Sequence, residues 1–143
     1  MIIQGLTNSF KSEMLQGVHD LSTDTIKLAL YTGSATLTPQ TTVYTTDEEV
    51  VATGYTAGGN TLTGVTIQIQ ANVPNTQPAV VYVSFDDAVF SAALTARGAL
   101  IYNSSKSNKS VAVISFGADK TSTNFFTVQM PPNTATDALI RFP

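Results

Sequence analysis

The clearest pattern of hydrophobic and polar positions lies between Thr95 and Phe116. Two apolar runs, Thr95–Asn103 and Ser110–Phe116, flank the polar segment Ser104–Lys109. This arrangement predicts an antiparallel hairpin with a longer connecting loop. Because neither face of the two runs is strongly polar, we expect central strands that are covered on both sides.

Shorter apolar stretches predict the other strands, and polar turn segments such as Asn72–Pro78 and Gly117–Asn124 separate them. The expected strands are Asp24–Tyr31, Thr61–Gln70 with one face in water, Ala79–Phe85, Val89–Phe90, Phe126–Met130 and Ala138–Phe142. Thr36–Tyr44 is polar and contains Pro39, so it is expected to be a loop or an edge strand.

Helical spacing is confined to the start of the chain. Phe10, Met14, Leu15 and Val18 form one apolar stripe in Thr7–Val18, with Thr7 or Asn8 as the cap and Gly17 at the end. Thr46–Glu49 matches a capping box and predicts at most two helical turns. With seven or eight short strands, the chain is expected to be all-β: a single antiparallel β-sandwich or jelly-roll domain, residues 1–143, with one short N-terminal helix.

The composition favours contact with a partner and argues against binding of nucleic acid. Of 143 residues, 43% are hydrophobic but only 12% are charged, about half the usual charged share. Packing such a surface against a partner costs little desolvation free energy, because few charged groups lose their water. The net charge of −3 argues against a nucleic-acid partner, and no apolar run is long enough to predict a membrane span.

The charges are unevenly distributed. Two lysines stand against eight acidic residues from Met1 to Phe90, whereas four cations stand against one acid from Arg97 to Lys120. This asymmetry could orient the molecule on a charged surface, and solvated loops explain it almost equally well.

Candidate chemistry is sparse, and we expect no catalytic residue, cofactor or metal. The chain has no cysteine, and its one histidine, His19, is expected to bond a free carbonyl at the helix end. A metal-assisted hydrolase would need Asp86, Asp87 and His19 to meet, yet adjacent strand residues such as the two aspartates point to opposite faces. The acids of Thr46–Glu49 suit a helix start, and Gly54–Gly59 lacks the spacing of a phosphate-binding loop.

Several stretches, in one order along nearly the whole chain, resemble a family of small virion proteins of tailed bacteriophages. They are Asn8–Lys11, Leu15–His19, Asp24–Tyr31, Thr53–Gly59 and Ala96–Gly117. The match is one of overall pattern, and the phage assignment comes from this resemblance alone. It implies a structural protein on the capsid surface of the virion, made in the bacterial host cytoplasm. The most plausible role that it implies is a cement or decoration protein.

This role implies the phage major capsid protein as the partner, together with a homo-oligomer, a dimer or a trimer. The two chain ends, Met1–Gly5 and Ala138–Phe142, are candidates for strands laid on a neighbouring sheet edge. The expected interface residues are Ile2, Ile3, Lys106, Asn108, Lys109 and Phe142. The alternative is a tail or head-fibre module that binds a host receptor or glycan, with Tyr55, Tyr82 or Tyr102 on the rim of a cleft.

Overall fold

The computed structural model describes all residues, 1–143, and has ten strands, one α-helix and one 3₁₀ turn. In chain order these are β1 (Gly5–Leu6), α1 (Asn8–Leu15), β2 (Ile26–Tyr31), β3 (Asn60–Thr61), β4 (Thr66–Gln70), β5 (Val80–Ser84), β6 (Ala88–Phe90), β7 (Thr95–Asn103), η1 (Ser104–Lys106), β8 (Lys109–Thr121), β9 (Phe126–Val128) and β10 (Ile140–Phe142). All strand ladders are antiparallel, which confirms the all-β class with a short N-terminal helix.

The hairpin formed by β7 and β8 is the centre of a five-stranded sheet with the order β1-β8-β7-β2-β3. β7 is buried along almost its whole length, and apolar clusters pack on both faces of this sheet. On one face Leu28, Leu30 and Ile101 belong to the main core, and on the other Tyr31 and Leu100 lie in a smaller core. The expectation of central strands covered on both sides is therefore confirmed.

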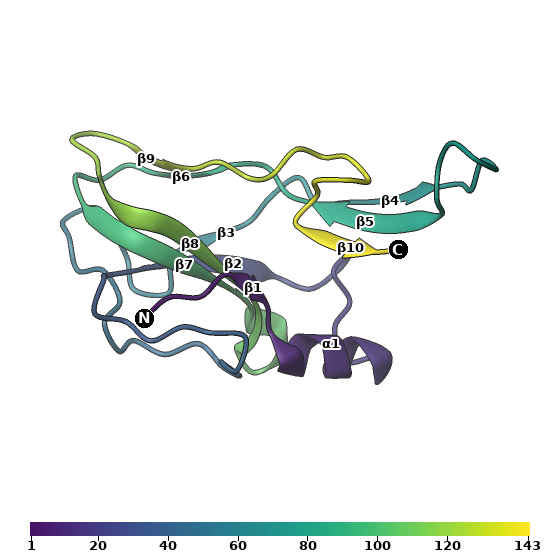
Figure 1. The fold of residues 1–143 in the computed structure, drawn as a ribbon. Coiled ribbons are helices and arrows are strands. Elements are labelled where there is room, and N and C mark those ends of the chain that lie inside the picture. Colours follow the sequence, from purple (N-terminus) through teal and green to yellow (C-terminus); the bar gives the residue numbers. More distant parts are fainter.

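A second layer covers the main core. It consists of a three-stranded sheet, β10-β5-β4, and the two-stranded β6-β9 ribbon. Figure 1 shows β6 and β9 above β7 and β8, while β4 and β5 project to one side of the molecule. Val83, Phe90, Phe126 and Ile140 of this layer pack against the five-stranded sheet in the main core.

Helix α1 begins where the sequence predicts but buries less of its stripe. Thr7 caps it, and the Thr7 hydroxyl accepts a hydrogen bond from the backbone N–H of Phe10. Phe10 is fully buried, whereas Leu15 is 92% exposed, so the predicted four-residue stripe is wrong at Leu15. The helix ends before Gly17, whose φ of +71° suits a helix terminus.

Two predicted segments differ in the structure. The polar stretch Gly117–Asn124 is not all turn, because β8 continues to Thr121 and pairs with Thr95 at its end. The ladder with β7 is interrupted by a register shift after Ser115 and resumes at Lys120 and Thr121, where pairing outweighs the local polar composition. The single strand expected at Thr61–Gln70 is split between β3 in one sheet and β4 in the other, and both faces of β4 are largely exposed.

The capping box at Thr46–Glu49 does not open a helix. The segment forms a turn in which Glu48 has a φ of +59°, and Glu49 is buried. The Glu49 carboxylate accepts hydrogen bonds from other parts of the fold, so it is not free to cap the Thr46 N–H. Tertiary contacts therefore override the local helix signal.

Candidate interaction surface

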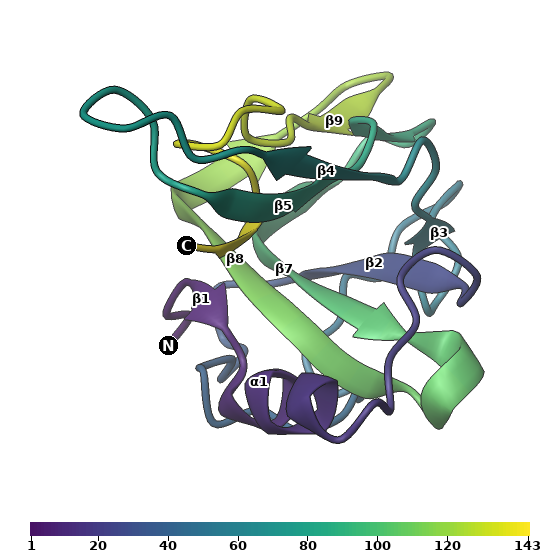
Figure 2. The same cartoon turned by 90° about the vertical axis from the view of Figure 1, so that its right-hand side faces the viewer.

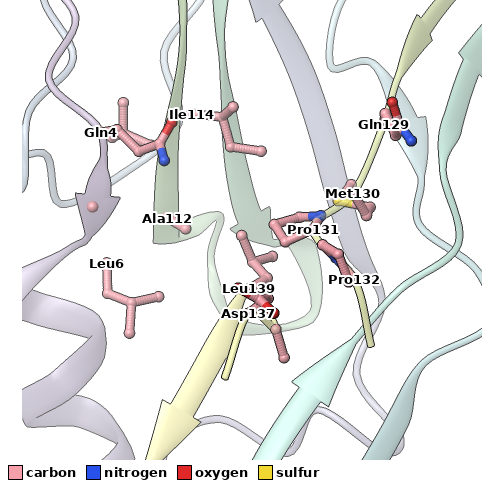
Figure 3. Close-up of a pocket in the computed structure, with 13 residues that line it drawn as sticks. Gln4, Leu6, Ala112, Ile114, Gln129, Met130, Pro131, Pro132, Asp137 and Leu139 are labelled. Atoms are coloured by element: carbon pink, nitrogen blue, oxygen red, sulfur yellow. The ribbon is translucent and has the colours of Figure 1, made fainter. Parts of the chain in front are cut away.

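An apolar trough runs along the outer edge of β8, between the two layers of the sandwich. Its narrower end has a volume of about 490 Å³ and is drawn in Figure 3. Leu6, Ala112 and Ile114 line it from the five-stranded sheet, while Met130 and Leu139 line it from the C-terminal segment. The wider end, about 820 Å³, shares Ile114 and Gln129 with the narrower one, so the two ends form one continuous groove.

The backbone of β8 is unpaired beside much of this trough. β1 pairs with β8 only at Ala112 and Val113, and no other strand lies on that side of β8. The Ser115 N–H is met by the Gln4 side chain, and the edge beyond it, to Thr121, has no strand partner. An unpaired strand edge next to side-chain pockets is the arrangement that accepts an extended peptide by strand addition.

The aromatic side chain of Phe125 stands at the wider end of the trough and is 65% exposed. Phe116 and Phe126 line the same end, and their ring centroids lie 5.8 Å apart. Aromatic side chains, Phe among them, are enriched at protein interfaces relative to the rest of the protein surface. The trough has two charged lining residues, Asp137 at one end and Lys120 at the other.

A second exposed surface lies on the β10-β5-β4 sheet. Cross-strand pairing places Ile69, Val81 and Phe142 in one row, and strand alternation puts this row on the same face as the buried Val83 and Ile140. Ile69, Val81 and Phe142 are 80%, 37% and 41% exposed. The core-facing side of this sheet therefore extends past the core at the row of Ile69, Val81 and Phe142, where no other element covers it.

The loop that covers the smaller core is fixed by the buried carboxylate of Glu49. Its Oε1 accepts hydrogen bonds from the Tyr55 hydroxyl and the Gly58 N–H, and its Oε2 accepts one from the Tyr44 hydroxyl, each at 2.7 Å. The Tyr102 hydroxyl donates to the carbonyl of Gly58 at 2.7 Å. These hydrogen bonds satisfy both carboxylate oxygens within the chain and hold the loop in place.

Burial is the main reason that the tyrosines of this cluster resist ionisation. It raises the pKa of Tyr102 to about 12, with the nearby Glu49 charge adding to the effect. Burial also raises the pKa of Tyr44 and Tyr55 well above the usual value, and their hydrogen bonds to Glu49 raise it further. The pKa of Tyr31 is raised by burial and by the Glu49 charge.

His19 does not bond a free helix carbonyl, so that prediction is wrong. Its Nδ1 lies 3.0 Å from the Asn103 side-chain nitrogen, which can only donate, and its Nε2 faces Glu13 at 3.7 Å. Asn103 also donates to Asp24 at 2.7 Å. Burial alone would raise the pKa of Asp24, but the bond from Asn103 and the nearby Lys106 hold it below the usual value. This network joins the end of α1 to the β7–β8 turn.

The three residues considered for metal-assisted hydrolysis do not meet. Asp87 accepts a hydrogen bond from the backbone of Met130, while Asp86 faces Thr63. His19 contacts Asn103 at the end of β7, and no group of three acidic or histidine side chains has the arrangement of a metal site.

The six expected interface residues come from three separate places. Lys106, Asn108 and Lys109 lie at the β7–β8 turn, Ile2 and Ile3 lie beside Leu37, and Phe142 lies in the exposed row of the three-stranded sheet. Figure 2 shows the two chain ends on one side of the molecule and the turn on the other. Of the six, Phe142 belongs to a continuous exposed apolar surface.

Both chain ends are hydrogen-bonded within the chain. The N–H of Ile3 donates to Leu37, the N–H of Leu37 donates to Met1, and β10 pairs with β5. Ile2 packs against Gly98 in the smaller core. The structure therefore offers these segments as folded parts of the sandwich, unlike the free arms expected from the sequence.

Most cations of the basic C-terminal half are paired with acids. Arg97 pairs with Asp119, Lys106 with Asp24 and Lys109 with Glu13. This pairing leaves little free positive charge to orient the molecule on a charged surface, which favours the interpretation as solvated loops.

The three tyrosines of the glycan-binding alternative do not share a cleft. The hydroxyls of Tyr55 and Tyr102 are engaged in the Glu49 cluster, and Tyr82 bonds Gln68 on the other layer. None of them lines a pocket.

Sequence reasoning missed the trough and, apart from Phe142, the exposed row. The trough arises where β1 stops short of the end of β8, which no local pattern reveals. The exposed row had a visible signal: from Val50 to Phe85 the sequence contains no charged residue, although β4 lies on the surface within that stretch. A surface strand without charge indicates a contact face.

Comparison with known proteins adds no identification. No family model, no curated protein and no solved structure matches the chain. None of the helices has the length and apolar composition needed to cross a membrane.

Proposed function

We propose that this chain is a non-enzymatic structural protein of a phage virion, a capsid cement or decoration protein that binds the major capsid protein and stabilises the shell. The assignment to a phage particle rests on the resemblance of the sequence segments described above. The observation that carries the binding role is the apolar trough beside the unpaired edge of β8.

The trough suits an extended segment of the capsid protein. The outer edge of β8 has no strand partner after Val113, and Ile114, Met130 and Leu139 form an apolar floor for the side chains of that segment. Phe125 provides an exposed aromatic contact at the wider end. Each contact of this kind is modest, but many copies on a shell hold by avidity when they are linked to one another.

The proposal is tested by adding the purified protein to expanded shells of the capsid protein encoded in the same genome. We expect saturable binding, a higher shell melting temperature, and hundreds of copies in each mature particle. Phe125→Ala should weaken binding at least tenfold while leaving the free energy of unfolding within about 0.5 kcal/mol of wild type, because the ring is largely exposed.

Leu15→Ala is the matched control, since Leu15 is an exposed apolar residue on α1, away from the trough. It should bind shells like the wild type. Absence of bound density and of shell stabilisation with the wild-type protein would overturn the proposal. A copy number of about a dozen would also contradict it and would instead indicate a portal, tail or fibre position.

A further inference from the structure

The edge of β4 is the one free strand edge of useful length without protection. β4 pairs with β5 on one side and with no strand on the other. Its sequence, Thr66–Gln70, carries no charge. Native proteins usually protect such edges with charged residues, bulges or very short strands. The free half of β8 has Asp119 and Lys120, and β10 has three residues including Arg141.

The side chains of β4 add an apolar surface to this bare edge. Ile67 is opposite Val83 and Ile69 is opposite Val81, so both isoleucines lie on the core-facing side of the sheet. Ile67 is 49% and Ile69 80% exposed, because the hairpin extends beyond the main body, as Figure 1 shows. The edge therefore lacks a strand, and its inner face lacks a cover.

We propose that β4 pairs with β4 of a second copy of this chain, antiparallel and about a two-fold axis at Gln68. This is the one two-fold register that pairs all five residues: Gln68 faces its own copy, Ile67 faces Ile69, and Thr66 faces Gln70. The two three-stranded sheets then form one six-stranded sheet. This inference goes beyond the capsid-binding role and does not depend on it.

The pairing is self-complementary in chemistry as well as in geometry. Isoleucines meet isoleucines on one face and neutral polar side chains meet on the other, and no like charges are brought together. The apolar row of Val81 and Ile69 continues into Ile67 and Val83 of the second copy. Because five paired residues make a small interface, we expect a dimer that dissociates in the micromolar range.

The first test measures mass by sedimentation velocity from about 1 to 200 µM. The wild type should pass from monomer to dimer over this range. Ile69→Lys should raise the dissociation constant at least tenfold, because it places two lysines at the pairing edge. Leu15→Lys introduces the same charge at a residue that is also largely exposed but lies on α1, and it should dimerise like the wild type.

The second test fixes the register by cross-linking. The chain has no cysteine, so a single introduced cysteine reports one position. Gln68→Cys should form an intermolecular disulfide under mild oxidation, since directly opposite residues have Cβ atoms about 4.5–5.5 Å apart. Gln70→Cys is the control: in this register the two copies of residue 70 lie about 14 Å apart, too far for a disulfide.

A chain that stays monomeric to 200 µM overturns the inference, as does a trimer. A dimer that Ile69→Lys leaves intact, or that links equally well through Gln70→Cys, overturns the proposed edge or register. Capsid binding is a separate readout, because Phe125→Ala should remain dimeric. A dimer that fails to bind shells would contradict the proposed function and leave this inference standing.

Discussion

Glu49 is a buried charge that the fold keeps because three donors satisfy it. The hydroxyls of Tyr44 and Tyr55 and the N–H of Gly58 hold its two oxygens, and the Tyr55 hydroxyl in turn accepts from the N–H of Leu30 in β2. The carboxylate therefore ties the loop over the smaller core to the central sheet. Removing one partner of such a network leaves the others buried without a bond.

We expect Glu49→Ala to lower the free energy of unfolding by about 2–4 kcal/mol, because two hydroxyls and one backbone N–H lose their acceptor. Urea unfolding followed by circular dichroism measures this change. Asp47→Ala, at an exposed neighbouring acid, should change stability by less than about 0.5 kcal/mol. Equal effects of the two substitutions would show that the Glu49 contacts contribute nothing.

The tyrosines around Glu49 predict a loss of stability at alkaline pH. An unfolded tyrosine ionises near pH 10, whereas the fold raises the pKa of Tyr102 to about 12 and those of Tyr31, Tyr44 and Tyr55 as well. The raised pKa values mean that the fold favours the neutral form of these tyrosines. Their contribution to the free energy of unfolding is therefore fully present below pH 10 and is lost as the pH rises toward 12 and above.

The urea midpoint, measured between pH 8 and pH 12, should stay level to about pH 10 and then fall. Tyrosinate absorbance should rise for these residues together with unfolding, since the folded cluster resists ionisation. A midpoint that stays constant to pH 12 would contradict this prediction.

At the scale of elements, the close approach of the Gly59 loop to β2 depends on a missing side chain. Gly59 has a φ of +73°, and a Cβ there would lie 1.8 Å from the carbonyl oxygen of Leu28. Gly17 has nearly the same φ, +71°, with nothing near its Cβ position. The two glycines therefore separate backbone strain from steric overlap.

Gly17→Ala should cost about 1–2 kcal/mol of stability, the strain of a left-handed residue with a side chain. Gly59→Ala should cost clearly more, enough to lower the melting temperature by at least twice as much, because β2 or the loop must move. Thermal unfolding of both variants tests this pair. Similar decreases in melting temperature for the two variants would show that the Gly59 loop moves easily to accommodate a side chain.

The elements that were predictable from sequence are those in which local pattern and tertiary environment agree. The β7–β8 hairpin, β2 and β5 combine apolar runs with polar turns, and they form where that pattern places them. The Thr7 cap of α1 was also readable, because capping is a local interaction.

The sequence-based predictions fail where contacts with residues distant in the chain determine the local structure. The polar stretch after Phe116 looks like a turn, but Lys120 and Thr121 pair with β7. Glu49 looks like a helix cap but is held by Tyr44, Tyr55 and Gly58. The interaction surfaces were hardest to predict, because an open strand edge exists only once the order of strands is known. The uncharged stretch Val50–Phe85 was the one available signal.

At the scale of the whole molecule, the two candidate surfaces lie on different edges of the sandwich. The trough follows β8, and the pairing edge is β4, which belongs to the other layer. Figure 2 shows β4 in the layer above the long β7–β8 hairpin. One copy can therefore contact a shell through the trough and a sister copy through β4 at the same time.

This separation predicts that dimerisation strengthens binding to the shell without adding a shell contact. The second copy of a bound dimer acts at a high local concentration when both troughs reach capsid sites, which increases apparent affinity by up to about 10²–10⁴. Ile69→Lys should therefore bind shells at least tenfold more weakly than wild type in cosedimentation, yet reach the same number of copies at saturation. Phe125→Ala should also bind weakly, but as a dimer, because it loses the contact between the trough and the shell. If Ile69→Lys is monomeric but binds with wild-type affinity, each copy holds the shell alone and the dimer adds nothing to cementing.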